Sequence, residues 1–259
     1  MIVTTSGRPN NHLIHSAEQI ALELSGSFIK RNKTSVEGIK RLCKDDVLVV
    51  GKNRIELHYF DQQSPLFFHP NSAMFRIKRL IKGEKDPLCE ACNLQYGDSF
   101  LDCTLGLASD SIVASYAVGE HGIVKGIEGS KNLAFIVKVG LQQWETGLNA
   151  LDDAMRRIDV STYDHLSFLR NCPDKSYDVI YFDPMFEETI EESVGLVPLK
   201  HIANYSPLEK ETINEAKRVA KRRIVLKDHW KSRRFEQHGF HVLVRKSAKF
   251  HYGVIEIEG

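Results

Sequence analysis

The segment YDVIYFDPMF, at residues 177–186, gives the strongest signal for a buried strand in this chain. Its first six residues form a short, largely apolar run, and an acidic residue and a proline follow directly. A run of this kind is typical of a strand that is covered on both faces, as the strands of parallel sheets are. We therefore predict a strand at Tyr177–Phe182 with Asp183 and Pro184 at its carboxyl end.

Weaker strand and helix signals alternate on both sides of this segment. Further strands are predicted at residues 100–103, 123–127, 158–161, 223–227, 240–244 and 250–257. With helices between them, they predict an α/β fold whose sheet is Rossmann-like, doubly wound, mostly parallel and seven-stranded. Residues 245–249 are too few for a parallel crossover, so the last strand is expected to run antiparallel.

The first part of the chain is predicted to form a small α/β domain of its own. Residues 2–5 are β-prone, apolar residues recur at helical spacing from 13 to 24, and two strand-like runs between 47 and 59 flank a turn. A polar stretch with glycine and proline at residues 82–87 is typical of a linker. We therefore predict one domain over residues 1–82 and a larger one over residues 83–259.

Composition and charge exclude several classes of protein. Of 259 residues, 42% are hydrophobic and 27% are charged, which is the balance of a globular chain whose core needs no disulfide or metal. The 35 lysines and arginines nearly match the 34 aspartates and glutamates, so any nucleic acid must be bound by local patches. The chain lacks a signal-peptide pattern and a bilayer-spanning apolar run, and its five cysteines are odd in number. We therefore expect reduced thiols, a cytoplasmic location and no membrane contact.

The cysteines and histidines show no metal-binding pattern. Cys89 and Cys92 form one C-x-x-C pair, whereas a structural zinc site needs four ligands, and no second pair has suitable spacing. We interpret the two cysteines as small residues on one helix face and expect no bound metal.

Acidic residues follow four successive strands of the predicted sheet. In chain order they are Asp102 with Asp110, Glu128, Asp164 and Asp183. Ligands of an open α/β sheet bind beyond the carboxyl ends of its strands. Four acidic strand ends, with Gly106 in the first loop, therefore indicate a ligand site rather than solvated surface.

The acidic residues favour a cationic cofactor over a nucleotide phosphate. The chain has no P-loop and only Gly106 where a dinucleotide-binding loop needs three glycines, and carboxylates repel phosphate. S-adenosylmethionine, with its sulfonium, ammonium, ribose diol and adenine, fits such a site. We expect Glu128 to accept from the ribose hydroxyls, Asp164 to accept from the adenine amino group, and Asp102 and Asp110 to face the amino-acid end. The predicted cofactor-binding residues are Asp102, Thr104, Gly106, Ser109, Asp110, Glu128, Gly129, Asp164, His165 and Asp183.

From Gly83 to the C-terminus the sequence resembles class I S-adenosylmethionine-dependent methyltransferases and, more narrowly, the bacterial small-subunit ribosomal RNA (guanine-N2) methyltransferases. The motifs that carry the resemblance are DxTxGLxxD at 102–110, Glu128, VIYFDPMF at 179–186, VLK at 225–227 and KF at 249–250. The resemblance implies methyl transfer to N2 of a guanine in ribosomal RNA. The sequence departs from the family at Ala108, Ser109 and Glu187, where the family has Gly, Arg and Pro.

The DPMF motif suits methyl transfer to an exocyclic amine. Such an amine is a poor nucleophile because its lone pair is delocalised into the ring. Hydrogen bonds from its N–H groups to the Asp183 carboxylate and the Pro184 carbonyl would orient it and localise the lone pair. Phe186 is expected either to stack on the base or to plug the strand end. We predict Asp183, Pro184, Met185 and Phe186 as catalytic residues and Lys227 as a substrate contact.

Two other interpretations are open at this point. Residues 118–128 resemble the corresponding segment of isoaspartyl methyltransferases, which would make the chain a protein carboxyl methyltransferase. An inactive relative that binds cofactor or RNA is the other, although the DPMF motif argues against it. Basic stretches at 76–82, 217–223 and 231–234 are candidate phosphate contacts or solvated surface, whereas the acidic run at 187–192 argues against RNA.

Overall fold

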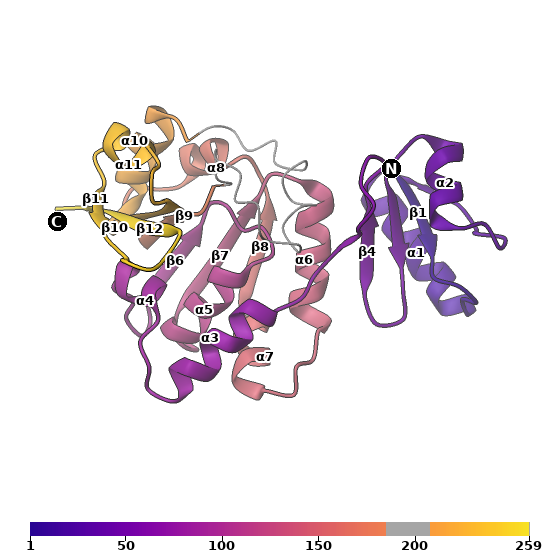
Figure 1. Cartoon of the computed structure of the whole chain (residues 1–259), viewed down its shortest axis with the longest axis horizontal. Helices are drawn as coiled ribbons and strands as arrows, with labels where there is room; N and C mark the ends of the chain where they lie inside the picture. Colours follow the sequence, from indigo (N-terminus) through magenta and orange to yellow (C-terminus); the bar gives the residue numbers. More distant parts are fainter. Residues whose placement is uncertain (185–207, 259) are drawn as a thin grey trace.

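The computed structural model describes residues 1–184 and 208–258 of the chain. Two sheets form the cores of two lobes (Figure 1). The larger lobe contains a seven-stranded sheet in the order β11-β12-β10-β9-β6-β7-β8. Its strands are β6 (Ser99–Asp102), β7 (Ile123–Glu128), β8 (Ile158–Thr162), β9 (Tyr177–Phe182), β10 (Ala220–His229), β11 (His241–Leu243) and β12 (Phe250–Glu256).

The strand directions confirm the predicted fold class. In the described part of the chain, every strand of this sheet except β12 runs parallel to the others. Strand β12 lies between β10 and β11 and pairs with both in the antiparallel direction. The short link between β11 and β12 is the reason, since a hairpin can join antiparallel strands but not parallel ones.

Helices cover both faces of the larger sheet (Figure 1). They are α3 (Asn71–Ile81), α4 (Pro87–Cys92), α5 (Ser109–Val118), α6 (Lys131–Gln143), α7 (Asn149–Arg156), α8 (His165–Asn171), α10 (Lys210–Val219) and α11 (Arg234–His238). Because strand side chains alternate, Phe100 and Tyr181 belong to one core with residues of α5, while Leu101 and Ile180 belong to a second core with residues of α8 and α10. None of the helices in the described ranges is long and apolar enough to cross a membrane.

The smaller lobe is an α/β unit around a five-stranded sheet. Its elements are β1 (Ile2–Thr5), α1 (Asn11–Glu23), β2 (Ser27–Phe28), α2 (Val36–Cys43), β3 (Val47–Val50), β4 (Ile55–His58) and β5 (Leu66–Phe67). Strand β1 is parallel to β2 and β3, and β3, β4 and β5 follow one another antiparallel. The predicted hairpin is present between β3 and β4, where the Gly51 N–H donates to the Arg54 carbonyl across 3.0 Å.

Helix α3 packs with the larger lobe, although it precedes the predicted linker. It contacts α5 and α7, and Arg76 of α3 forms an ion pair with Asp110 of α5. The polar stretch at residues 82–87 is therefore the turn between two helices of one lobe, and such a turn is as polar as a linker. We propose a domain boundary between β5 and α3, at residues 68–70, in place of the predicted boundary at residue 82.

The two lobes touch where Phe68 packs on α6. Gly140 of α6 makes room for this ring, because a Cβ atom at that position would lie 2.2 Å from the Phe68 Cγ atom. The Phe68 ring also meets Trp144 edge-on, with 6.0 Å between the ring centroids. Beside this contact, a hollow of about 990 Å³ lies between α1, the β3–β4 turn and α6.

Candidate active site

The carboxyl ends of β6, β9 and β10 meet where the order of the strands reverses. Strand β6 has β7 on one side and β9 on the other, which makes its end the switch point of the sheet. Asp102 ends β6, Asp183 directly follows β9, and Lys227 lies in β10 one residue beyond the paired residues Leu226 and Phe182. The fold therefore brings these three side chains to one edge of the sheet, where a ligand site is expected.

Lys227 joins two carboxylates at this edge. Its Nζ atom donates to the Asp110 Oδ2 atom across 2.9 Å and to the Asp183 Oδ2 atom across 2.7 Å. Asp110 lies at the start of α5, and its Oδ2 atom also accepts from the Tyr181 hydroxyl across 2.8 Å. The Asp183 side chain is 28% exposed and the Asp110 side chain 9%, so Asp183 is the carboxylate that faces outward.

Asp110 is held from the opposite side by Arg76. The guanidinium of Arg76 donates to the Asp110 Oδ1 atom and forms a fork with Asp86, at 2.7 and 2.8 Å. Burial disfavours the charged form of Asp110, but Lys227 and Arg76 outweigh it and hold its pKa below the usual range. Burial and the neighbouring Asp110 charge raise the pKa of Asp183, and Lys227 opposes this shift only in part. Asp110 is thus the firmly ionised anchor, and Asp183 is the stronger proton acceptor.

Asp102 shapes the loop that follows β6. Its side chain is buried and accepts from the Thr104 N–H across 3.0 Å and from the Ser111 hydroxyl across 2.6 Å. Burial raises the pKa of Asp102 to about 7, against the effect of these two donors. The Thr104 Oγ1 atom in turn accepts from the Asp183 N–H across 2.6 Å. The first loop and the end of β9 are therefore fixed to each other.

Glu128 forms a second group with the glycine of the first loop. It ends β7, is buried, and accepts from the Gly106 N–H across 3.2 Å and from the Ser130 N–H across 2.8 Å. Gly106 has φ +50°, a left-handed conformation that favours glycine. A Cβ atom at Gly106 would meet nothing closer than 3.9 Å, and one at Gly129 nothing within 4 Å. The backbone at both glycines therefore faces open space in which a ligand can approach closely.

Unpartnered polar atoms lie at the starts of α5 and α8. The Ser109 hydroxyl is buried and has no hydrogen-bond partner among the described residues. His165 is buried at the start of α8, meets the Phe182 ring edge-on at 6.1 Å, and its Nε2 atom has no partner in the described ranges either. Burial lowers the pKa of His165, so the imidazole is neutral and can donate or accept one hydrogen bond.

Asp164 has a structural task as well as its predicted one. It is the N-cap residue of α8, and its Oδ2 atom accepts from the Ser167 N–H across 2.9 Å. A carboxylate can accept several hydrogen bonds, so the capping role does not prevent Asp164 from accepting one from an adenine amino group. Met185, Phe186 and the acidic run at 187–192 lie outside the described residues.

Several residues at this edge were not predicted. The basic stretch at 76–82 suggested phosphate contacts, but Arg76 turns inward to two carboxylates, which corrects that interpretation for this residue. The alternation of Tyr177–Phe182 was the available signal for Tyr181, since an inward hydroxyl needs a buried partner.

The smaller lobe also comes within electrostatic reach of Glu128. Burial raises the pKa of the Tyr59 hydroxyl in that lobe, and the charges of Asp46 and Glu128 raise it further.

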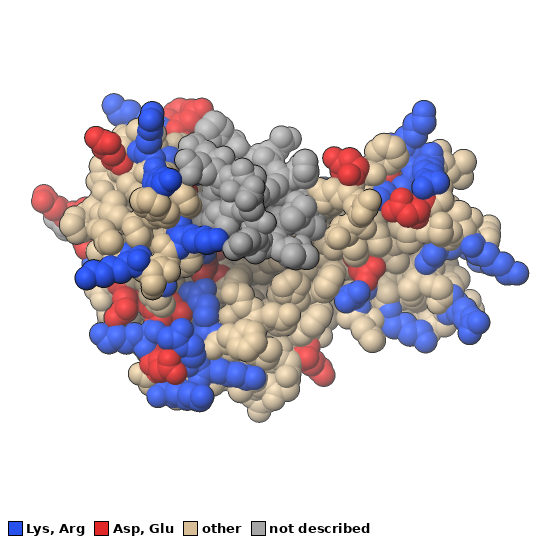
Figure 2. Space-filling view, viewed as in Figure 1, with Lys and Arg blue, Asp and Glu red and all other residues tan. Residues whose placement is uncertain are grey.

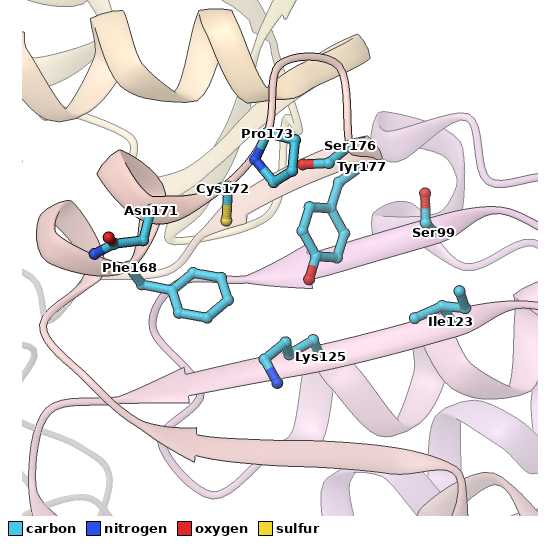
Figure 3. A pocket seen from close by; sticks show the side chains of 9 residues that line it. All are labelled: Ser99, Ile123, Lys125, Phe168, Asn171, Cys172, Pro173, Ser176 and Tyr177. Atoms are coloured by element: carbon cyan, nitrogen blue, oxygen red, sulfur yellow. The ribbon is translucent and has the colours of Figure 1, made fainter.

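The opposite edge of the sheet contains a hollow of about 440 Å³ (Figure 3). Ser99, Ile123 and Tyr177 line it at the first residues of β6, β7 and β9. Figure 3 shows the Phe168 and Tyr177 rings facing this space. The hollow thus lies at the amino ends of the strands, away from Asp183 and Lys227.

The chain matches a known protein family over most of its length. The family model described as "Putative SAM-dependent methyltransferase" matches residues 39–252. The chain belongs to this methyltransferase family. Its cofactor is accordingly S-adenosylmethionine. Its fold is also that of a solved SAM-dependent methyltransferase.

The relatives of this methyltransferase include one uncharacterized protein and two methyltransferases. It is 52% identical over 255 residues to the Bacillus subtilis protein YpiP, described as uncharacterized, with 98% of this chain and 99% of that protein covered. It is 26% identical over 191 residues to ribosomal RNA small subunit methyltransferase J of Buchnera aphidicola, with 70% and 74% covered. The crystal structure of the SAM-dependent methyltransferase NGO1261 from Neisseria gonorrhoeae matches with a TM-score of 0.64 at 14% identity, with 100% and 97% covered. At that identity the structural match shows the fold.

Proposed function

We propose that this methyltransferase modifies the exocyclic amine, N2, of a guanine in small-subunit ribosomal RNA. The observation that carries the proposal is Asp183, which directly follows the central strand β9, is partly exposed, and is held by Lys227 at the switch point. The 26% identity to ribosomal RNA small subunit methyltransferase J supports the same substrate class. An RNA substrate of this kind also agrees with the predicted cytoplasmic location.

The residues at the carboxyl edge fit S-adenosylmethionine. The open backbone at Gly106 and Gly129 leaves room for the nucleoside, and Glu128 beside them supplies the carboxylate for the ribose hydroxyls. The unpartnered Ser109 hydroxyl and His165 Nε2 atom are further polar groups for the cofactor. Asp102 and Thr104 keep the loop in shape, Asp110 fixes Lys227 and with it Asp183 at this edge, and Asp164 stays the proposed acceptor for adenine.

The bound cofactor supplies an electrophilic methyl group on a sulfonium. The protein has to hold the amine in line with it and accept hydrogen bonds from the N–H groups. Asp183 suits this task because burial and Asp110 raise its pKa, which makes its carboxylate a better acceptor for a proton that the amine loses. The Pro184 carbonyl is the proposed second acceptor, and Met185 and Phe186 complete the proposed catalytic motif.

Lys227 has a different proposed role from the substrate contact that the sequence suggested. Its Nζ atom already donates to Asp110 and Asp183, and Arg76 and Tyr181 fix Asp110 in turn. We propose that Lys227 positions the Asp183 carboxylate, since an ammonium shared by two carboxylates restricts where both can lie.

A carboxyl methyltransferase fits this site less well. A carboxylate acceptor has no N–H to donate to Asp183, and the two negative groups would repel each other. The raised pKa of Asp183 is useful for an amine, which must lose a proton, and has no task in methylation of a carboxylate.

The proposal is tested by comparing modified nucleosides in ribosomal RNA from cells with and without this protein, by mass spectrometry. We expect the cells without it to lose one N2-methylguanosine, and the wild-type gene but not Asp183→Ala to restore it. Asp159→Ala is the matched control, because Asp159 lies near the start of β8 with an exposed side chain and should restore the modification. Unchanged ribosomal nucleosides, or restoration by Asp183→Ala, would contradict the proposal.

A further inference from the structure

We propose that a cationic and aromatic surface after β10 and before β12 binds the RNA strand that carries the target base. This surface, the β10–β12 rim, consists of Trp230, Lys231, Arg233, Arg245, Lys246 and Lys249. The proposal rests on the proposed function and adds where the substrate is held. Four observations carry it: position, charge, an exposed aromatic ring and a continuous path to Asp183.

The rim lies at the same edge of the sheet as the candidate active site. Strand β10 runs parallel to β9, so the residues after His229 leave the sheet at the edge where Asp183 follows β9. The turn before β12 is held next to them, because the Trp230 N–H donates to the Lys249 carbonyl across 3.2 Å. Two segments of chain therefore form one surface beside Asp183.

The rim is strongly cationic in a chain that is otherwise balanced. Residues 227–250 contain seven lysines and arginines and only two acidic residues, while the whole chain has a net charge of +1. One of the two, Asp228, is buried and pairs with Arg234 at 2.9 Å. Lys231, Arg233 and Lys246 are exposed. Figure 2 shows lysine and arginine side chains over the left part of the larger lobe, with aspartate and glutamate side chains between them. Such a local excess attracts a phosphate backbone and is screened by salt.

The rim also presents an aromatic ring to solvent. Trp230 is 50% exposed, and the Lys231 Nζ atom lies over its ring, 4.9 Å from the centroid. A flat indole beside an ammonium can stack with a base while the cation meets the adjacent phosphate. An anionic membrane or an acidic protein would use the charges but would not need an exposed aromatic ring on which a base can stack.

A stack of side chains joins the rim to the catalytic edge. Phe250, the first residue of β12, has the Lys227 Nζ atom 5.1 Å from its ring centroid and the Arg245 guanidinium 4.5 Å from it. The Nη1 atom of Arg245 is buried and has no hydrogen-bond partner within the described parts of the chain. Positive charge therefore continues from Lys227, which touches Asp183, through Phe250 to the outer part of the rim.

The test measures RNA affinity and cofactor affinity separately. The probes are an in-vitro transcript of the small-subunit ribosomal RNA, in filter binding at several salt concentrations, and S-adenosylmethionine, in calorimetry. We expect Lys231→Ala combined with Arg233→Ala to weaken RNA binding at least tenfold and to reduce the salt slope by one to two, since each phosphate contact contributes about 0.7 to 0.9. Trp230→Ala should weaken binding about tenfold and Trp230→Phe only about twofold. Cofactor affinity should stay unchanged in all of them.

The matched control removes two exposed lysines elsewhere. Lys78→Ala combined with Lys82→Ala changes the net charge equally on α3, a basic stretch that the sequence also suggested, and should alter RNA affinity less than twofold. The proposal would be overturned if the rim variants bound RNA as tightly as the wild type, or if the α3 control lost as much RNA affinity as they do. If cells without the protein lose N2-methylguanosine but the rim variants bind RNA like the wild type, only the proposal about the rim is refuted. If the rim variants bind RNA more weakly but cells without the protein lose no modified nucleoside, the RNA-binding role of the rim is supported and the proposed reaction is refuted.

Discussion

The two edges of the seven-stranded sheet carry the same pair of residue types on the same two strands. At the amino edge, Lys221 of β10 donates to Asp178 of β9 across 3.3 Å, and at the carboxyl edge Lys227 donates to Asp183 across 2.7 Å. The Lys221 side chain is 42% exposed and that of Lys227 is 17% exposed. Burial works against ionisation of Asp178, but hydrogen bonds from Ser99 and Lys221 outweigh it and lower its pKa, whereas the pKa of Asp183 is raised.

The difference shows that the chemistry depends on surroundings rather than on residue type. Asp178 accepts from the Ser99 N–H and hydroxyl, at 2.8 and 2.5 Å, and so fastens β9 to β6. Asp183 shares its lysine with Asp110, which leaves it less stabilised as an anion. The amino edge has the open hollow of Figure 3, yet the linked charges lie at the other edge. A hollow alone therefore does not locate the reaction.

The largest expected effect separates the two lysines of β10. Lys227→Met leaves Asp183 and part of Asp110 without their cation in a mostly buried place, and we expect it to cost about 3–5 kcal/mol in the free energy of unfolding and to abolish methyl transfer. Lys221→Met removes a half-exposed ion pair and should cost about 0–1 kcal/mol with activity retained. Urea unfolding and a methyl-transfer assay measure both. Equal costs would remove the distinction between the edges.

The next effect concerns the pH dependence of stability, with opposite signs at the two edges. The pKa of Asp102 is raised from 3.8 to about 7, so the folded state holds a proton that the unfolded state releases, and stability falls as pH rises from about 4 to about 7. At about 1.4 kcal/mol per pKa unit this loss is on the order of 4 kcal/mol, and Asp102→Asn should remove it.

Asp178 is the control for that measurement. Its pKa is lowered, so its contribution is present above the ordinary pKa of 3.8 and is lost as pH falls through the folded value. Asp178→Asn should therefore weaken the protein mainly at neutral pH. Guanidinium unfolding of the wild type and the two variants from pH 2 to pH 8 gives the slopes. Slopes of the same sign for both residues would contradict a raised pKa of Asp102 in the folded state.

The smallest expected effect concerns cofactor affinity. Glu128→Gln keeps the shape of the side chain but removes the charge from its proposed contact with the ribose hydroxyls, and we expect about 10- to 100-fold weaker binding of S-adenosylmethionine, which corresponds to about 1.4–2.7 kcal/mol. Tyr177→Phe, in the hollow at the amino edge, should change this affinity less than twofold. Isothermal titration calorimetry compares the two. A similar loss for both variants would show that the cofactor does not distinguish the two edges.

The sequence predicted the central parts of the fold closely and the ends of elements less well. The strand at Tyr177–Phe182 begins and ends where it was expected, because a buried strand has a continuous apolar signal. Strand β10 was predicted at 223–227 but extends over Ala220–His229. At its C-terminal end Asp228 and His229 are strand because they pair with His251 and Phe250 of β12, and at its start Ala220 pairs with Tyr177 of β9. Pairing with a distant segment leaves no mark in the local pattern.

The candidate site was likewise predicted only in part from the sequence. The sequence by itself determined that acidic residues end the strands, because alternating strands and helices bring the carboxyl ends of parallel strands to one edge. Only the tertiary structure decided how these charges are used. Asp110 meets Arg76 across 34 positions and Lys227 across 117, and it is this shared burial, rather than any spacing in the chain, that leaves Asp183 outward-facing with a raised pKa. Charge and burial act through space, so residue order could name the carboxylates but not which of them is anchored and which is left to react.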